Sequence, residues 1–210
     1  MEDQYKNIAN WYDRIFESAN SGLRNIGMKM YPVNAGMDVL DIGCGTGALL
    51  RMYQKEKCNI FGIDLSTAML KVARKKLGDD ADLKLCDATD TCFPDNKFDL
   101  ILSSTVLHEM SQQVRENVLK EANRILKNDG RILLIDFHPG PLKIMKGVIP
   151  KILITIAETL AGGEHYKNYR QFIKNGGLPS LIKSTEFEVE AQKIVGGGTF
   201  GIILLKKKMI

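Results

Sequence analysis

Short apolar runs alternate with amphipathic stretches from Asp38 to Phe137, and this alternation restricts the possible folds more than any other feature of the sequence. Strands that are buried on both faces consist largely of Val, Ile, Leu and Phe, and helices connect them in βα units. The apolar runs predict strands at 38–42, 59–64, 83–87, 98–103 and 131–137, and the stretches between them predict helices at 46–55, 66–77 and 112–126. Ser66 is a suitable N-cap for the second helix, and the turn 128–130 is expected to stop the third.

The two ends of the chain depart from this pattern. Residues 1–31 are predicted to be helical, with the apolar residues Ile8, Trp11, Tyr12, Ile15 and Phe16 on one face. Residues 142–184 form a helix-rich insert after the fifth strand. Residues 187–208 predict two antiparallel strands that are closed by a glycine-rich turn. Residues 1–210 are therefore expected to form one α/β domain with seven strands, in which residues 1–31 form a helical cap and residues 142–184 a lid.

Charge and cysteine content exclude several classes of protein. The net charge is +4, without the dense basic stripe of a nucleic-acid-binding protein, so no nucleic-acid partner is expected. The four cysteines form no CxxC pair and have no histidine cluster beside them, so neither a metal site nor a disulfide framework is expected. The charged N-terminus lacks the apolar core of a signal peptide, so we expect a cytoplasmic protein with reduced thiols.

Residues 39–47, VLDIGCGTG, combine a strand with a glycine-rich turn that opens a helix. Glycine suits such a turn because the backbone must bend tightly and approach a ligand without a Cβ in the way. The following helix directs its free N–H groups at that ligand. Asp64 ends the second strand about 20 residues later, where a carboxylate can accept hydrogen bonds from both hydroxyls of a ribose. The turn and this acid form a minimal site for a nucleoside cofactor.

The spacing of the glycines indicates which nucleoside is bound. Dinucleotides are bound by Gly-x-Gly-x-x-Gly, with a pyrophosphate at the helix N-terminus. This chain has Gly43-x-Gly45-x-Gly47 directly after Asp41. The Asp41 carboxylate would repel a pyrophosphate, but it attracts the positive amino or sulfonium end of S-adenosylmethionine (SAM). Asp87, which ends the third predicted strand, can accept a hydrogen bond from the adenine amino group.

Four segments resemble, in order, the motifs of class I SAM-dependent methyltransferases: VLDIGCGTGALL (39–50), GIDLSTAML (62–70), CDATDTCFPDNKFDLILSSTVLHEM (86–110) and LKEANRILKNDGRILLIDF (119–137). They are most similar to the small-molecule branch that includes the ubiquinone/menaquinone C-methyltransferases. The resemblance covers residues 1–137, and the C-terminal hairpin by topology only. It implies a Rossmann-like three-layer sandwich with a seven-stranded, mostly parallel sheet in the order 3-2-1-4-5-7-6. It also implies transfer of a methyl group from SAM to a small acceptor.

The resemblance further implies which residues bind the cofactor. SAM contacts are expected at Asp41, Gly43, Gly45, Asp64, Leu65, Asp87, Ala88 and Ser103. Neighbours within the same motifs are expected to complete the site, namely Cys44, Thr46, Gly47, Ser66, Met69, Cys86 and Ser104. The segment YKNIANWYDRIF (5–16) is similar to the helix with which this branch covers the cofactor, so Tyr5 and Tyr12 are expected to reach SAM.

The acceptor side of the site is less determined by the sequence. His108 follows the fourth strand, where the family places residues that face the methyl acceptor, and its imidazole suits a general base at neutral pH. The alternative is that His108 only satisfies a backbone carbonyl. Tyr166 is the second candidate for the base, and His138 and His165 are weaker candidates for facing the acceptor. A base is needed only if the acceptor must lose a proton.

Other functions remain open at this stage. Within the same enzyme class, the chain could methylate the nitrogen of an amine or a lipid head group. It could also be a SAM-binding module without turnover, since binding and catalysis use different residues, and an NAD-dependent oxidoreductase is a third hypothesis. Fold alone does not decide among these functions.

The insert carries an apolar stripe that bears on the acceptor. Met145, Ile149, Ile152, Ile156 and Leu160 recur at three- or four-residue spacing, with Pro150 as an expected kink. Such a helix is expected to pack over the sheet as a lid and to wall the acceptor pocket. Alternatively, residues 142–160 contact a membrane surface or admit an isoprenoid or acyl tail. Either hypothesis predicts a hydrophobic or aromatic acceptor.

Overall fold

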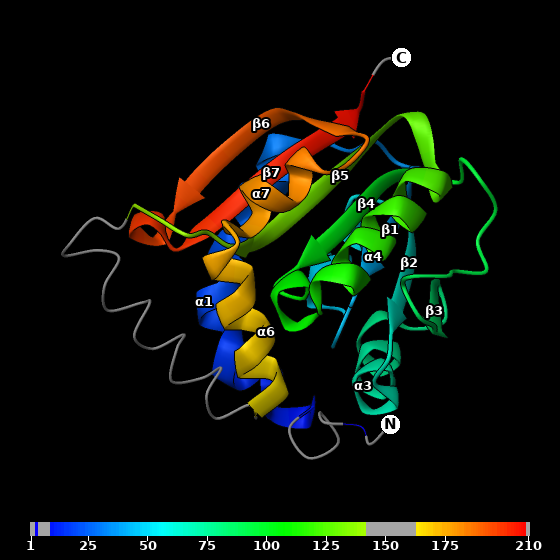
Figure 1. Cartoon of the computed structure of the whole chain (residues 1–210). Coiled ribbons are helices and arrows are strands. Elements are labelled where there is room, and N and C mark those ends of the chain that lie inside the picture. Colours follow the sequence, from blue (N-terminus) through cyan, green and yellow to red (C-terminus); the bar gives the residue numbers. More distant parts are fainter. Residues whose placement is uncertain (1–2, 4–8, 142–162, 209–210) are drawn as a thin grey trace.

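A single seven-stranded sheet organises the protein (Figure 1). The computed structural model describes residues 3, 9–141 and 163–208, and only the backbone of residues 10–19. The sheet has the order β3-β2-β1-β4-β5-β7-β6, as predicted. Five strands are parallel: β1 (Asp38–Ile42), β2 (Asn59–Asp64), β3 (Ala81–Leu85), β4 (Phe98–Ser104) and β5 (Leu126–Phe137). The strands β6 (Phe187–Val195) and β7 (Phe200–Lys207) form the predicted antiparallel hairpin, joined by a short 3-10 turn, η2 (Gly196–Gly198).

Helices cover both faces of the sheet. One face carries α1 (Ala9–Met30), α2 (Ala48–Lys55) and α3 (Thr67–Leu77), and the other carries α4 (Gln112–Ile125), α6 (Gly163–Lys174) and α7 (Gly177–Lys183). Side chains alternate between the faces along each strand, so Leu133 packs with the first group of helices and Leu134 with the second. The two buried clusters on either side of the sheet confirm the three-layer sandwich.

Several predicted element boundaries are correct, and others differ by two residues. The bounds of β1, β2 and β6 are as predicted. Ser66 is the N-cap of α3, and its Oγ accepts a hydrogen bond from the amide of Met69 at 3.1 Å. The helix expected from residue 46 begins at Ala48, because Gly47 has a left-handed φ of 73°. β3 spans Ala81–Leu85 rather than 83–87: Ala81 and Asp82 already pair with β2, and the strand ends at Leu85 because the Asp87 carboxylate turns back to accept from the amide of Thr89.

The junction of α4 and β5 differs from the prediction. The helix ends at Ile125, and Leu126 is already extended and pairs with Phe98, so β5 starts five residues earlier than expected. The turn at 128–130 therefore does not stop the helix but produces a shift of register within the strand. Leu126 is fully buried, and a Cβ on Gly130 would lie 2.8 Å from its Cδ1. Burial of Leu126 in the core overrides the local turn signal.

Parts of the predicted cap and lid lie outside the described residues. They are Tyr5, the apolar face predicted at residues 8–16 with the side chain of Tyr12, and residues 142–162 with their apolar stripe and Pro150. The described part of the insert is helical, as predicted, and consists of α6 and α7. Among the helices of residues 9–141 and 163–208, none is long and apolar enough to cross a membrane.

The N-cap of α3 gives a first test of the structure. Ser66 is buried, and besides capping the helix it donates to Asp3 Oδ1 at 2.8 Å. Ser66→Ala is expected to lower the free energy of unfolding by about 1–2 kcal/mol in urea denaturation, because it removes both bonds. Ser111→Ala is the matched control, since the corresponding bond at the start of α4 is longer, at 3.4 Å, and a smaller loss is expected. Equal losses in the two variants would contradict this account.

Candidate cofactor and acceptor site

The glycine turn between β1 and α2 is built for close approach. Gly43, Gly45 and Gly47 all have positive φ angles, between 51° and 73°. A Cβ on Gly43 would lie 2.6 Å from Val106 Cγ2, and one on Gly47 would lie 2.7 Å from Leu77 Cδ1. At Gly45, by contrast, no described atom beyond its two chain neighbours lies within 4 Å of the same position. Two glycines are thus required by packing, while Gly45 leaves room for a ligand.

Asp41 is a buried carboxylate with an unused acceptor. Its side chain lies at the carboxyl end of β1 and is 2% exposed, and its Oδ1 has no hydrogen-bond partner among the described residues. Burial raises the pKa of Asp41 to about 8, while the charge of Arg24 opposes this and that of Asp64 adds to it. A buried acceptor without a donor is costly, so this oxygen suits a ligand that brings a positive N–H group. Ser103 at the end of β4 has a similarly buried and unpartnered Oγ among the described residues.

Asp64 is fixed in place by two backbone amides. Its Oδ2 accepts from the amide of Gly45 at 2.8 Å, and its Oδ1 accepts from the amide of Ser66 at 2.8 Å. Burial raises the pKa of Asp64, and these N–H bonds oppose the rise. A carboxylate has about four acceptor positions, so lone pairs remain for two ligand hydroxyls. The adjoining Leu65 is 65% exposed and offers an apolar surface beside the carboxylate.

The remaining predicted cofactor residues lie at the same ends of the strands. The amide of Cys86 bonds to the carbonyl of Asp64, which places the start of the β3–β4 loop beside β2. Asp87 is exposed and its Oδ1 holds the loop through Thr89, whereas Ala88 packs against the core. Four others are buried or half-buried and support the turn or the sheet: Cys44, Thr46, Met69 and Ser104. Burial raises the pKa of the Cys44 thiol, as expected for a packing residue.

His108 belongs to a buried pair with Asp136. It lies on a 3-10 turn, η1 (Leu107–Glu109), after β4, and its Nδ1 is 2.7 Å from Asp136 Oδ1 on β5. Its backbone N–H also donates to Asp136 Oδ2, at 3.2 Å. Both side chains are at most 3% exposed. His108 is therefore not satisfied by a backbone carbonyl alone but is oriented by a carboxylate, the arrangement that fixes a base.

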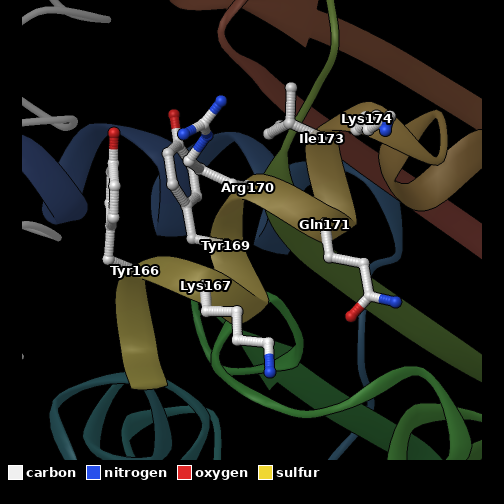
Figure 2. A pocket seen from close by; sticks show the side chains of 7 residues that line it. All are labelled: Tyr166, Lys167, Tyr169, Arg170, Gln171, Ile173 and Lys174. Carbon is white, nitrogen blue, oxygen red and sulfur yellow. The ribbon is translucent and has the colours of Figure 1, made fainter. Parts of the chain in front are cut away.

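Tyr166 lies on α6, at a cavity of about 780 Å³ (Figure 2). Figure 2 shows Tyr166, Tyr169 and Arg170 on one side of the helix and Lys167 and Gln171 on the other. Tyr166 is half-buried against the core, and Tyr169 is buried with its ring 6.2 Å from that of His108. The structure thus brings α6 next to η1. His138 lies apart, at the end of β5, where burial lowers its pKa and its Nδ1 accepts from the amide of Gly140.

Comparison with known proteins decides the family. The profile of a methyltransferase domain matches residues 40–134. The chain is 31% identical to the ubiquinone/menaquinone biosynthesis C-methyltransferase UbiE of Paraburkholderia phytofirmans, over 81% of this chain and 75% of that protein. The chain belongs to this family of SAM-dependent methyltransferases.

Two further comparisons define how far the likeness extends. The demethylmenaquinone methyltransferase of Tropheryma whipplei is 34% identical over 66% of this chain, and the match spans 60% of that relative's length. The TehB-like SAM-dependent methyltransferase of Corynebacterium glutamicum has a TM-score of 0.62 at 20% identity, covering 95% of this chain and 97% of that one. The last of these shows that the methyltransferase shares the family's fold.

SAM is the cofactor of this family, and the residues at the strand ends fit it. The unpartnered Asp41 Oδ1 provides a buried acceptor for a cationic amino group. Gly45 leaves space beside it, and Asp64 is fixed with lone pairs to spare. Within residues 3, 9–141 and 163–208, no group of His, Cys, Asp and Glu side chains could hold a metal ion.

Two residues near the site were not predicted from the sequence. Arg24 on α1 is 8% exposed, and its charge acts on Asp41. The sequence feature that could have indicated Arg24 is its position three residues before Gly27. Gly27 packs closely against Leu133 of the sheet, so residues at this helical spacing lie on the buried face of α1. Asp3 accepts hydrogen bonds from Ser66 Oγ, Thr67 Oγ1 and the Ala68 amide at the N-terminus of α3. Nothing in the sequence pattern distinguishes Asp3 from other acids near the chain start.

Proposed function

We propose that this methyltransferase binds SAM at the carboxyl ends of β1 to β4 and methylates a small, hydrophobic or aromatic molecule. The observation that carries the proposal is the buried, unpartnered oxygen of Asp41 beside the open position at Gly45. A nicotinamide dinucleotide would place an anionic pyrophosphate at this turn, which would keep Asp41 protonated or be repelled by its ionised form. An amino acid end with a positive amino group completes the Asp41 site instead.

The binding roles follow from the chemistry of each side chain. Asp41 accepts from the cofactor's amino group, and Arg24, whose charge acts on Asp41, is suited to the cofactor's carboxylate. Asp64 accepts from the ribose hydroxyls, and Leu65 covers the adenine ring with its exposed side chain. The Oδ1 of Asp87 accepts both hydrogen bonds from Thr89, so the other carboxylate oxygen is left for the adenine amino group.

Catalysis rests mainly on positioning. Bound SAM supplies a methyl group on a positively charged sulfur that becomes neutral when the methyl leaves. The chain holds the acceptor in line with this group, which lowers the barrier by several kcal/mol, on the order of 7–11 in well-oriented systems. His108, oriented by Asp136, is the first candidate for the base, because the carboxylate stabilises a proton on the imidazole. Tyr166, on the neighbouring helix α6, is the second.

The acceptor is proposed to be aromatic and of the quinol type. The cavity on α6 is lined by aromatic and aliphatic groups of Tyr166, Tyr169 and Ile173 and also by three positively charged residues and a glutamine, namely Lys167, Arg170, Lys174 and Gln171. The relatives from Paraburkholderia phytofirmans and Tropheryma whipplei are named for quinone methylation. Purified protein, SAM and a short-chain demethylmenaquinone reduced in solution provide the test. Release of S-adenosylhomocysteine that depends on the quinol supports the proposal, and binding of NAD in place of SAM contradicts it.

Asp64→Ala tests the ribose-binding role. The variant is expected to weaken SAM binding in isothermal titration calorimetry by about 10- to 100-fold, because hydrogen bonds to a charged group contribute about 1.5–3 kcal/mol each before water compensates. Asp90→Ala is the control, since Asp90 is an exposed acid in the neighbouring loop. The SAM affinity of this variant is expected to equal that of the wild type. Unchanged SAM affinity in Asp64→Ala would rule out the assignment.

A further inference from the structure

Glu109 lies between two histidines, one on η1 and one on α6. Its Oε1 is 3.9 Å from His108 Nε2, and its Oε2 is 3.6 Å from His165 Nε2 on α6. His108 is in turn paired with Asp136. We propose that Glu109 takes the proton that the methyl acceptor loses and passes it to His165. This inference rests on the proposed function, because it assigns a role within the acceptor half of that site.

Burial separates the roles of these groups. The side chain of His108 is 3% exposed, while that of Glu109 is 24% and that of His165 is 14% exposed. The His108 ring also packs against Phe137, at 4.5 Å between centroids. A group that takes a proton from a bound molecule must be within hydrogen-bond reach of it. Glu109 is the most exposed of these three side chains, so in the inferred relay it takes the place of His108 as the base, and His108 with Asp136 becomes a positioning pair behind it.

The position of Glu109 also suits the reaction. Val106, three residues earlier, packs directly on Gly43 of the cofactor turn. On α6, Tyr166 and Tyr169 line the cavity, and Tyr166 directly follows His165 in the sequence. Glu109 therefore follows closely in the chain on a residue that contacts the cofactor turn, and its carboxylate reaches His165 on the helix that lines the cavity.

A backbone frame sets the distances within this group. Arg115 on α4 donates to the carbonyls of Leu107 and Asn168, at 2.7 and 3.0 Å. Asn168 Nδ2 donates to the carbonyl of Glu109, at 2.8 Å. These bonds join η1 to α6, so the separation of Glu109 and His165 does not depend on their own side chains alone.

The relay gives a stronger base than Glu109 would be alone. A free Glu carboxylate has a pKa near 4.3 and an imidazole one near 6.5, so a proton that ends on an imidazole is held by a base suited to neutral pH. The acceptor's electron pair forms the bond to the methyl carbon while the sulfur–carbon pair returns to sulfur. The acceptor's proton moves to Glu109, then to Nε2 of the neutral His165, and finally to water. The acceptor class is therefore one that loses a proton on methylation, such as an aromatic C–H or a phenol.

Titratable or charged groups of four elements surround this relay in the described part of the chain. They are His108 on η1, Asp136 on β5, Arg115 on α4, and His165, Tyr166 and Tyr169 on α6. Any pH effect of a Glu109 variant has to be read against these groups.

Histidine titration by NMR tests the relay without an acceptor. The chain has three histidines, and His138 serves as an internal reference. In Glu109→Gln the midpoint of His165 is expected to move to lower pH, on the order of one unit, because a carboxylate within ion-pair distance favours the charged imidazole. Glu164→Gln, which changes an exposed acid next to His165, is the control and should leave the midpoint in place. An unmoved His165 in Glu109→Gln overturns the inference.

Turnover of the reduced short-chain demethylmenaquinone is the second readout. Glu109→Gln is expected to lower kcat about 100-fold with SAM affinity within twofold, and Glu109→Asp to restore part of it. His165→Asn should lower kcat and shift the acid limb of the pH–rate profile to lower pH. If wild type binds SAM and methylates the quinol while Glu109→Gln matches its rate, the inference fails and the proposed function stands. If wild type binds no SAM, the proposed function itself fails.

Discussion

Asp41→Asn is expected to stabilise the ligand-free protein at pH 8 while it weakens SAM binding. Burial raises the pKa of Asp41 from 3.8 to about 8 in the folded state. Between these values the folded state holds a proton that the unfolded chain has released, so stability falls as the pH rises through this window. Each pKa unit is worth about 1.4 kcal/mol, so the full shift corresponds to roughly 5 kcal/mol at the upper end of the window. Asn carries no charge and escapes this loss.

Urea unfolding at pH 5 and pH 8 measures the effect. The free energy of unfolding of the wild type should fall by several kcal/mol more than that of Asp41→Asn between the two values. The exposed Asp87→Asn is the control and should follow the wild type. In calorimetry, Asp41→Asn should bind SAM about 10- to 100-fold more weakly, because it loses a hydrogen bond between charged groups. Parallel pH dependence in the wild type and Asp41→Asn would show that Asp41 is not desolvated as described.

The features that could be predicted from the sequence depend on neighbouring residues in the chain. The bounds of β1 and β2 follow from apolar runs that the sheet buries on both faces. The glycine turn was predictable because Gly43, Gly45 and Gly47 take positive φ angles, which are a local property of the backbone. Ser66 as N-cap of α3 is likewise a local matter. The strand order came from the resemblance of the motifs to a known family rather than from these patterns.

The features that could not be predicted depend on contacts between distant segments. Leu126 leaves the helix because it pairs with Phe98 and is buried, although the turn signal lies further on. The pairing of His108 with Asp136 joins residues 28 positions apart, and periodicity does not encode such a contact. The position of Arg24 beside Asp41 arises from the packing of α1 on the sheet. A sequence pattern shows which side chains are buried, but not which polar groups meet there.

Arg115 carries the second large effect, because it joins the two segments of the acceptor side. It is fully buried, and its guanidinium donates to the carbonyls of Leu107, His108 and Asn168. Its guanidinium also lies 4.7 Å from the ring centroid of Phe172. Burial lowers the pKa of Arg115 to about 10, which still leaves it charged at neutral pH. η1 and α6 are therefore held together by one buried cation and the carbonyls around it.

Arg115→Met is expected to lower the free energy of unfolding by about 3–5 kcal/mol, because it fills the space but leaves buried carbonyls without donors. For a chain of this size the melting temperature should fall by roughly 10 °C. Arg115→Lys keeps the charge without the planar fork, so an intermediate loss is expected. Because Arg115 contacts η1 and α6 but not the glycine turn, the folded variants should keep SAM affinity and lose turnover. A variant that loses SAM affinity and turnover together would contradict this expectation. It would show that η1 and the cofactor site act as one unit rather than as separate cofactor and acceptor sides.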